Sequence, residues 1–170
     1  MLDLDEAFGA AIAAEPIRRY ETRKQSTWLM VDAASGVRLQ ALIDHVGTDA
    51  YLSSYLNDEF TTLWLIAEDG SVRVAIEEFV LEDHSHHLTA PMPRGYGSKT
   101  KIGHPGLVEG LGGRIGGELA VNRSDGKCYL TNASGRFGYS RSAGELENAA
   151  ERFREFGVQV IARYVRSTWQ

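Results

Sequence analysis

Side chains that could do acid/base chemistry or bind a phosphate group gather in the second half of the chain. An imidazole or a carboxylate can move a proton, and a guanidinium can hold a phosphate through two parallel hydrogen bonds. We assign candidate catalytic roles to His104, Glu118 and Ser134. Candidate phosphate-binding and pocket-capping roles fall to Arg114, Arg136 and Tyr139. A structural reading stays open beside this one, in which Glu118 pairs with Arg136, Ser134 shapes a turn and His104 anchors a loop.

A predicted hairpin would position these groups. The runs 118–122 and 127–131 are rich in strand-forming residues and flank a turn that ends at Gly126, where glycine supplies the positive φ of a tight turn. The open ends of such a hairpin lie side by side, at Glu118 and Thr131. We therefore expect Ser134 and Arg136 to come within reach of Glu118, with His104 and Arg114 entering from the preceding loop.

Charge and glycine are concentrated around the same residues. The segment 91–142 holds twelve of the eighteen glycines and has a charge of +5, which leaves −10 on the rest of the chain. Exposed backbone N–H groups and local positive charge favour an anion or phosphate site. A solvated basic loop explains the composition equally well.

Known phosphate and metal motifs fit poorly. Gly97–Thr100 lacks the glycine that a phosphate loop places before its lysine, and Gly110–Gly117 lacks the third glycine of a dinucleotide fingerprint. His84, His86 and His87 have no second cluster to complete a metal site, so we interpret them as a solvated loop and expect no metal. Glu77 and Glu78 adjoin on a predicted strand and should point to opposite faces, one exposed and the other in a hairpin salt bridge.

The remaining elements predict an α+β fold. We expect an antiparallel-rich sheet built from hairpins, with an N-terminal helix and a C-terminal helix packed on it. The C-terminal helix should begin after Ser142, with Glu145 completing a capping box, and should end at Gly157. The other expected elements are a helix over 2–14, a hairpin of strands 26–32 and 37–43, a short helix over 48–58, a hairpin of strands 61–67 and 72–80, and a last strand over 158–165.

Length and composition indicate one globular domain. The 170 residues with 43% hydrophobic content suit a single core, with a helix and hairpin over 1–60 and a hairpin–loop–hairpin–helix–strand module over 61–165. The net charge of −5 opposes the coating of nucleic acid, so we expect no DNA partner. The lone Cys128 excludes an internal disulfide.

No apolar run approaches the roughly 18 residues that span a bilayer, and the acidic N-terminus differs from a signal peptide. We expect a cytoplasmic protein without membrane contact, although a specialised secretion system could export it.

The order of motifs in the module resembles that of a C-terminal module of bacterial polymorphic toxins, and it is also similar to a region of plant IQ-motif calmodulin-binding proteins. The likeness covers about 61–165 and rests on Gly103-His104, Gly117-Glu118 and the stretch Asn132-Ala-Ser-Gly-Arg-Phe137. It departs from those relatives at Pro105-Gly106, where they usually carry serines, and at Arg136, where a second histidine is more common. No IQ motif is present, so calmodulin binding does not transfer.

The resemblance implies the setting of a bacterial effector or toxin and no particular reaction. Together with the candidate residues it favours an enzyme that acts on a nucleotide-containing substrate, by ADP-ribosyl transfer from NAD or by RNA cleavage. We prefer the first because the net charge opposes binding to a polyanion. The expected ligand is then an anionic small molecule or nucleotide. The alternative is a non-catalytic immunity or adaptor protein that covers a basic protein partner.

Overall fold

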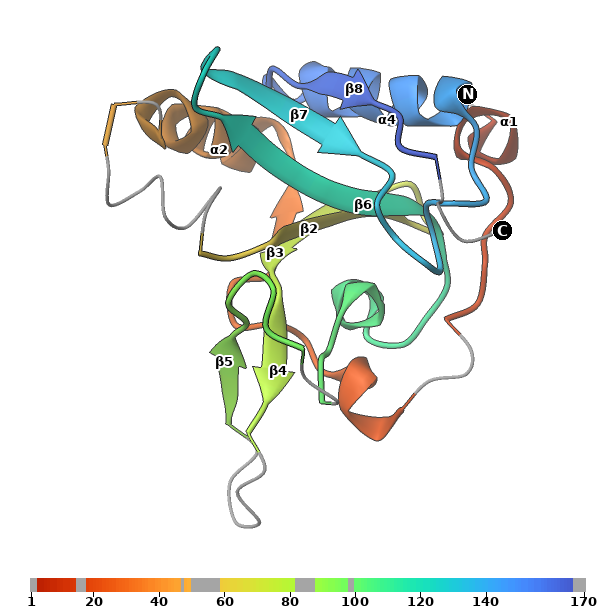
Figure 1. The fold of residues 1–170 in the computed structure, drawn as a ribbon. Coiled ribbons are helices and arrows are strands. Elements are labelled where there is room, and N and C mark those ends of the chain that lie inside the picture. The colour runs from red at the N-terminus through yellow and green to blue at the C-terminus, as the bar shows by residue number, and fades with distance from the viewer. Residues whose placement is uncertain are drawn as a thin grey trace.

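The protein is described by a computed structural model that covers residues 3–14, 18–46, 48–49, 59–81, 88–97 and 100–166. Its central sheet has the strand order β1-β3-β2-β6-β7-β8, and β4 and β5 form a separate two-stranded sheet (Figure 1). The strands are β1 (Leu29–Val31), β2 (Thr62–Ala67), β3 (Val72–Ile76), β4 (Glu78–Val80), β5 (Thr89–Pro91), β6 (Gly113–Asn122), β7 (Lys127–Thr131) and β8 (Ile161–Arg163). The helices are α1 (Leu4–Phe8), α2 (Ala33–Val46) and α4 (Ala143–Glu155), with the 3-10 turns η1 (Arg19–Thr22) and η3 (His104–Val108).

Two predicted hairpins form the middle of the central sheet. Strand β2 pairs with β3 and β6 pairs with β7, both antiparallel, and the turns contain Gly70 at φ 80° and Gly126 at φ 67°. After α4 the chain returns to the sheet as β8, which lies parallel to β7 and forms one edge of the sheet through a β–α–β connection. The α+β fold with a helix near each end of the chain is therefore confirmed.

One face of the central sheet packs against α2 and α4, which lie behind it in Figure 1. Trp64 of β2 is fully buried there and meets Phe153 of α4 edge to face, with ring centroids 5.9 Å apart. Cys128 of β7 is buried in the same core, and burial raises its pKa to about 12. Cys128 is therefore a packing residue and an unreactive thiol.

A second, smaller core lies on the opposite face of β2 and β3. Leu63 and Leu65 of β2 pack there against Leu107 of η3 and Phe137 of the turn that follows β7. This cover brings η3, and with it His104, onto the sheet beside β6. The second core thus positions the predicted site.

The predicted hairpin of strands 26–32 and 37–43 is wrong, because residues 33–46 form helix α2. Asp32 accepts hydrogen bonds from the backbone N–H groups of Ala34 and Ser35, which start the helix. The buried Leu39 and Ile43 are four residues apart, so they share one face of a helix. The same spacing also places them on one face of a strand, where alternate residues point the same way. The alternation therefore had a helical explanation that the prediction missed.

The other boundaries differ less. Helix α1 is shorter than the predicted 2–14, because Gly9 takes φ 78° and ends it. Helix α4 begins after Ser142 with the predicted capping box, and Gly157 takes φ 82° beyond its end. Strand β8 is shorter than the predicted 158–165. Most of the predicted helix over 48–58, and the three histidines at 84–87, lie outside the described residues.

None of the helices in the described part of the chain has the length and apolar character that crossing a bilayer requires.

Candidate functional site

His104 lies against β6 directly before Glu118. Its Nε2 is 2.9 Å from the carbonyl oxygen of Gly117, which can only accept, so Nε2 carries the proton and Nδ1 is the unprotonated ring nitrogen. The side chain keeps some exposed surface, yet the packed atoms around the ring lower the pKa of His104 to about 4, and the charges of Lys101 and Arg136 add to that shift. The imidazole is therefore neutral at pH 7 and weakly basic.

Gly116 makes room for this ring. A Cβ at that position would lie 2.9 Å from the carbonyl oxygen of Trp64 and 3.3 Å from Cδ2 of His104. At Gly117 a Cβ would overlap the carbonyl oxygen of Thr131 on the neighbouring strand β7. The glycines before Glu118 thus allow close packing, which accounts for the Gly-Glu part of the motif.

Ser134 belongs to a tight turn that the Asn-x-Ser-Gly stretch builds. Its buried hydroxyl accepts a hydrogen bond from the backbone N–H of Phe137 at 3.2 Å, and Phe137 is fully buried. Asn132, also fully buried, donates to the carbonyl oxygen of Val165 at 3.1 Å and accepts from the N–H of Val165 at 2.7 Å. The turn thereby ties the end of β7 to the end of β8. These contacts give Asn132 and Ser134 a structural role.

Arg136 forms an ion pair with a residue from the first part of the chain. Its NH2 group is 3.0 Å from Oε1 and 3.1 Å from Oε2 of Glu21, which follows Tyr20 in η1, and its NH1 group donates to the carbonyl oxygen of Ala14 at 3.1 Å. The side chain of Glu21 is only 12% exposed. The sequence left open an ion pair between Arg136 and Glu118; the structure gives Arg136 the partner Glu21 and gives Glu118 the partner Arg94. To bind a phosphate, Arg136 would have to give up these contacts.

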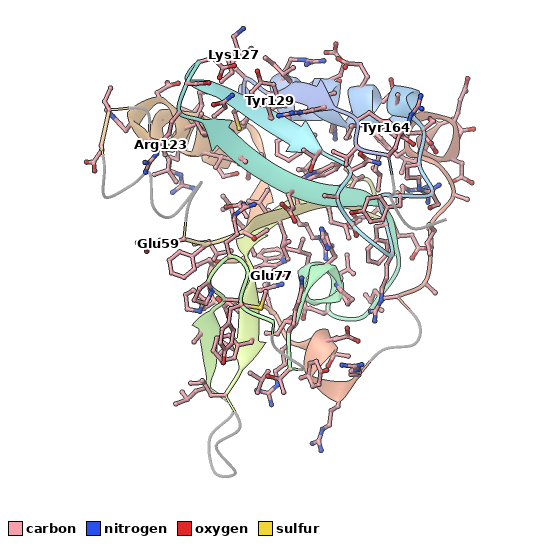
Figure 2. All side chains as sticks on the ribbon, in the orientation of Figure 1. Glu59, Glu77, Arg123, Lys127, Tyr129 and Tyr164 are labelled. Carbon is pink, nitrogen blue, oxygen red and sulfur yellow. The ribbon has the colours of Figure 1, made fainter. Side chains whose placement is uncertain are left out.

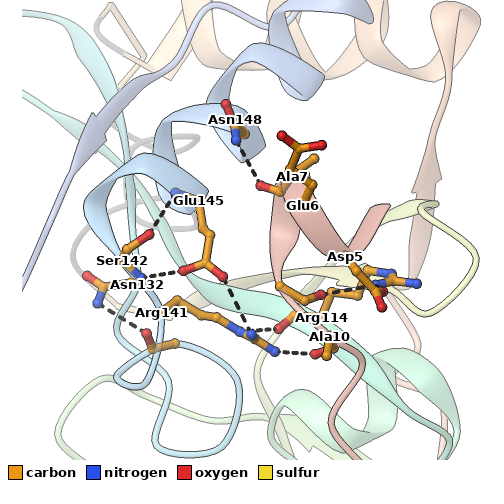
Figure 3. Close-up of polar contacts among 12 residues, drawn as sticks. Asp5, Glu6, Ala7, Ala10, Arg114, Asn132, Arg141, Ser142, Glu145 and Asn148 are labelled. Carbon is orange, nitrogen blue, oxygen red and sulfur yellow. Dashed lines mark hydrogen bonds and ion pairs between the residues drawn. The ribbon is translucent and has the colours of Figure 1, made fainter. Parts of the chain in front are cut away.

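Arg114 reaches toward the N-terminal segment, where Asp5 lies beside it (Figure 3). It pairs with Asp5 of α1 and donates to the carbonyl oxygens of Gly9 and Glu68, each at 3.0 Å. The side chain is only 9% exposed. Beside it, Arg141 donates to the carbonyl oxygen of Arg114 at 2.8 Å, which fixes this strand against the start of α4. Arg114 therefore lies apart from the neighbourhood of His104 and Glu118.

Tyr139 is 38% exposed and follows the same turn as Ser134. Its backbone N–H donates to the carbonyl oxygen of Ser134 at 3.0 Å. The ring's predicted role as a pocket cap stays a prediction.

Glu118 instead joins a cluster of four charged side chains, which we call the charged cluster: Glu77, Arg94, Lys101 and Glu118. Arg94 NH1 is 3.7 Å from Oε2 of Glu118, and both side chains are about a third or more exposed, at 40% and 33%. Lys101 Nζ is 2.6 Å from Oε1 of Glu77, whose side chain is only 3% exposed. The first pair is loose and open to solvent, and the second is close and half covered.

The electrostatics link the two pairs and His104. Burial raises the pKa of Glu77, the charge of Glu118 adds to the rise, and the cations Lys101 and Arg94 oppose it. Lys101 is also one of the charges that lower the pKa of His104. The gathering predicted at the hairpin mouth therefore occurs in part. His104 contacts the residue before Glu118, the charges of Lys101 and Arg136 act on His104, and Arg94 pairs with Glu118.

The prediction for Glu77 and Glu78 is wrong in one respect, because both are buried, at 2% and 0% exposure. Alternation fails here because β3 ends at Ile76 and the chain enters a different sheet at Glu78 (Figure 2). Oε1 of Glu78 accepts hydrogen bonds from both the backbone N–H and the hydroxyl of Ser26. Two adjacent acids inside an apolar run were the sequence signal that could have revealed buried carboxylates.

The charged cluster can bind an anion or move a proton. A partly exposed carboxylate such as Glu118 can stabilise a developing positive charge, while nearby cations such as Arg94 can hold phosphate oxygens. Within the described ranges, no group of three or more histidine, cysteine, aspartate or glutamate side chains is arranged to hold a metal ion. Hollows of about 200, 290 and 400 Å³ open beside η1, beside η3 and between α2 and β7, and neither His104 nor Glu118 lines any of these three.

The chain was compared with known proteins in three ways. No protein-family model matches it, and neither the curated proteins nor the solved structures provide a match.

Proposed function

We propose that the protein is a toxin-like effector enzyme that acts on a nucleotide-containing substrate at the charged cluster. The observation that carries the proposal is Glu118, a partly exposed carboxylate whose partner Arg94 is 3.7 Å away and itself 40% exposed. A pair this loose can open to admit a ligand at little cost, because exposed ion pairs contribute only about 0–1 kcal/mol. The effector setting comes from the resemblance to polymorphic toxins.

ADP-ribosyl transfer from NAD is the preferred reaction and RNA cleavage the second. Arg94 and Lys101 would bind phosphate oxygens, in place of the Arg114 and Arg136 that the sequence suggested. Glu118 would stabilise the positive charge that develops on the ribose as its bond to nicotinamide breaks, or act as the base in RNA cleavage. His104 would hold the Gly117-Glu118 backbone in place through its hydrogen bond to the carbonyl oxygen of Gly117.

A comparison of two glutamate variants in a bacterial host tests the proposal. Glu118→Gln removes the charge of the site, and Glu151→Gln removes a charge of the same type from α4, where Glu151 is 64% exposed and pairs with Arg154. The wild type and Glu151→Gln should change the cellular NAD or RNA pool measured by mass spectrometry, and Glu118→Gln should not. If all three proteins change a pool equally, or if none does although all are folded, the proposal is refuted.

An immunity or adaptor protein is the second candidate function. The observation that favours it is that Arg114, Ser134 and Arg136 are all engaged in contacts within the chain. The −10 charge outside 91–142 would then cover a basic face of a toxin. Rescue of growth when the chain is expressed with a cognate toxin supports this function, whereas toxicity of the chain alone supports the enzyme. For either function we propose that the protein resides in the cytoplasm and that a specialised secretion system could export it.

A further inference from the structure

No helix in the described part of the chain packs on one face of the β6–β7–β8 part of the central sheet. Cys128 and Leu130 of β7 point into the core under α2 and α4, so Lys127 and Tyr129 must project from the opposite side. Figure 2 shows both side chains along β7. The second core, which covers this side of β2 and β3, contains no residue of β7 or β8.

Strand β8 extends this surface. Tyr129 pairs with Ile161 and Thr131 pairs with Arg163 in the parallel ladder, so Ile161 and Arg163 share the face of Tyr129. The guanidinium carbon of Arg163 is 5.8 Å from the centre of the Tyr129 ring, which confirms the shared side. We call Lys127, Tyr129, Ile161 and Arg163 the open face.

The open face has an apolar centre with cations at its rim. Ile161 is 42% exposed, and the ring of Tyr129 lies beside it on β7. Lys127 and Arg163 are exposed on either side of that centre, and Asp125 accepts the hydroxyl hydrogen of Tyr129 at 2.7 Å. Tyrosine and arginine are enriched where protein interfaces bury most of their binding energy, and opposite charges at a rim select the partner.

We propose that the open face binds an acidic segment of a partner protein, with Lys127 and Arg163 pairing with its carboxylates and Ile161 and Tyr129 covered by its apolar side chains. Single-stranded nucleic acid fits less well, because that mode stacks successive bases on several exposed aromatic rings. The open face has Tyr129 alone, and its ring and hydroxyl are already engaged by Arg163 and Asp125. The inference is independent of the function proposed for the charged cluster.

The experiment is an NMR titration of the whole protein with a short synthetic peptide of Glu, Asp and Leu. Two probes serve as controls: the same peptide with Lys in place of its acids, and a single-stranded oligouridylate. The acidic peptide should shift the amide signals of β7 and β8, and added salt should weaken it, because surface ion pairs are screened. The double variant Lys127→Glu/Arg163→Glu should weaken binding by about tenfold or more.

A matched double variant controls for net charge. Arg38 lies on α2 and Arg152 on α4, so Arg38→Glu/Arg152→Glu makes the same change in charge on the helical side of the sheet. This variant should bind the acidic peptide like the wild type. The proposal would be overturned if both double variants lost binding equally, if the lysine peptide bound as well as the acidic one, or if the shifts were confined to other elements. Preference for the oligouridylate would also overturn it, as would self-association that Lys127→Glu/Arg163→Glu abolishes.

Discussion

His104 should make the protein less stable as the pH falls from 7 to 5. The native imidazole has a pKa of about 4, against an ordinary value of 6.5. Below pH 6.5 the unfolded chain therefore binds a proton that the native state refuses, so the free energy of unfolding falls until the pH reaches the native pKa. For these two pKa values the loss is about 2 kcal/mol at pH 5 and about 3 kcal/mol at pH 4.

His104→Gln isolates this contribution, because a glutamine amide can still donate to the carbonyl oxygen of Gly117 but does not titrate. Urea unfolding at pH 7 and pH 5 should show a fall in stability for the wild type that is about 2 kcal/mol greater than for the variant. NMR titration of the ring should locate its pKa directly. An imidazole that titrates near pH 6.5, or a variant that loses as much stability as the wild type, would contradict a lowered pKa for His104.

Three further changes test the packing and charges around the site. Gly117→Ala should lower the free energy of unfolding by about 1–3 kcal/mol, because the added Cβ would overlap a carbonyl oxygen of β7. Gly135→Ala is the control: its Cβ would meet nothing within 4 Å, and it should change the free energy of unfolding by less than about 0.5 kcal/mol. Equal denaturation midpoints for the two variants would contradict this. Glu77→Gln should stabilise the protein at pH 7, because burial raises the pKa of Glu77 and so disfavours its charged form. This gain should vanish in acid, where the wild-type carboxyl group is protonated. A loss of stability at pH 7 that is absent in acid would show that the fold favours the charged carboxylate. Arg136→Ala should cost about 1–3 kcal/mol by leaving Glu21 without its partner, and adding Glu21→Gln should restore part of the loss; no restoration in this double-mutant cycle would argue against the ion pair.

Local signals in the sequence predicted much of the sheet and the last helix. Gly70 and Gly126 each lie in the turn between two strands that are adjacent in the chain, so each hairpin could be predicted without knowledge of the rest of the fold. The capping box at Ser142 is equally local. Helix α2 was missed because Leu39 and Ile43 fit a strand and a helix alike. Its capping residue, Asp32, lay inside what had been interpreted as the previous strand.

The candidate site depended on contacts between distant segments. His104 was correctly expected beside Glu118, because the hairpin and the loop before it constrain both. Arg114 and Arg136 are held by Asp5 and Glu21, which come from the opposite end of the chain. The sequence pattern gives no sign of such pairs. The charged cluster was missed for a related reason, since its members come from three separate segments that meet only where the chain passes between two sheets.

A catalytic role for Glu118 is tested by assaying the purified protein for release of nicotinamide from NAD and for cleavage of RNA, with Glu118→Gln and Glu151→Gln in parallel. The wild type and Glu151→Gln should turn over one of these substrates, and Glu118→Gln, with an unchanged melting temperature, should be slower by about a hundredfold or more. Equal turnover by a folded Glu118→Gln protein would contradict a catalytic role for this carboxylate.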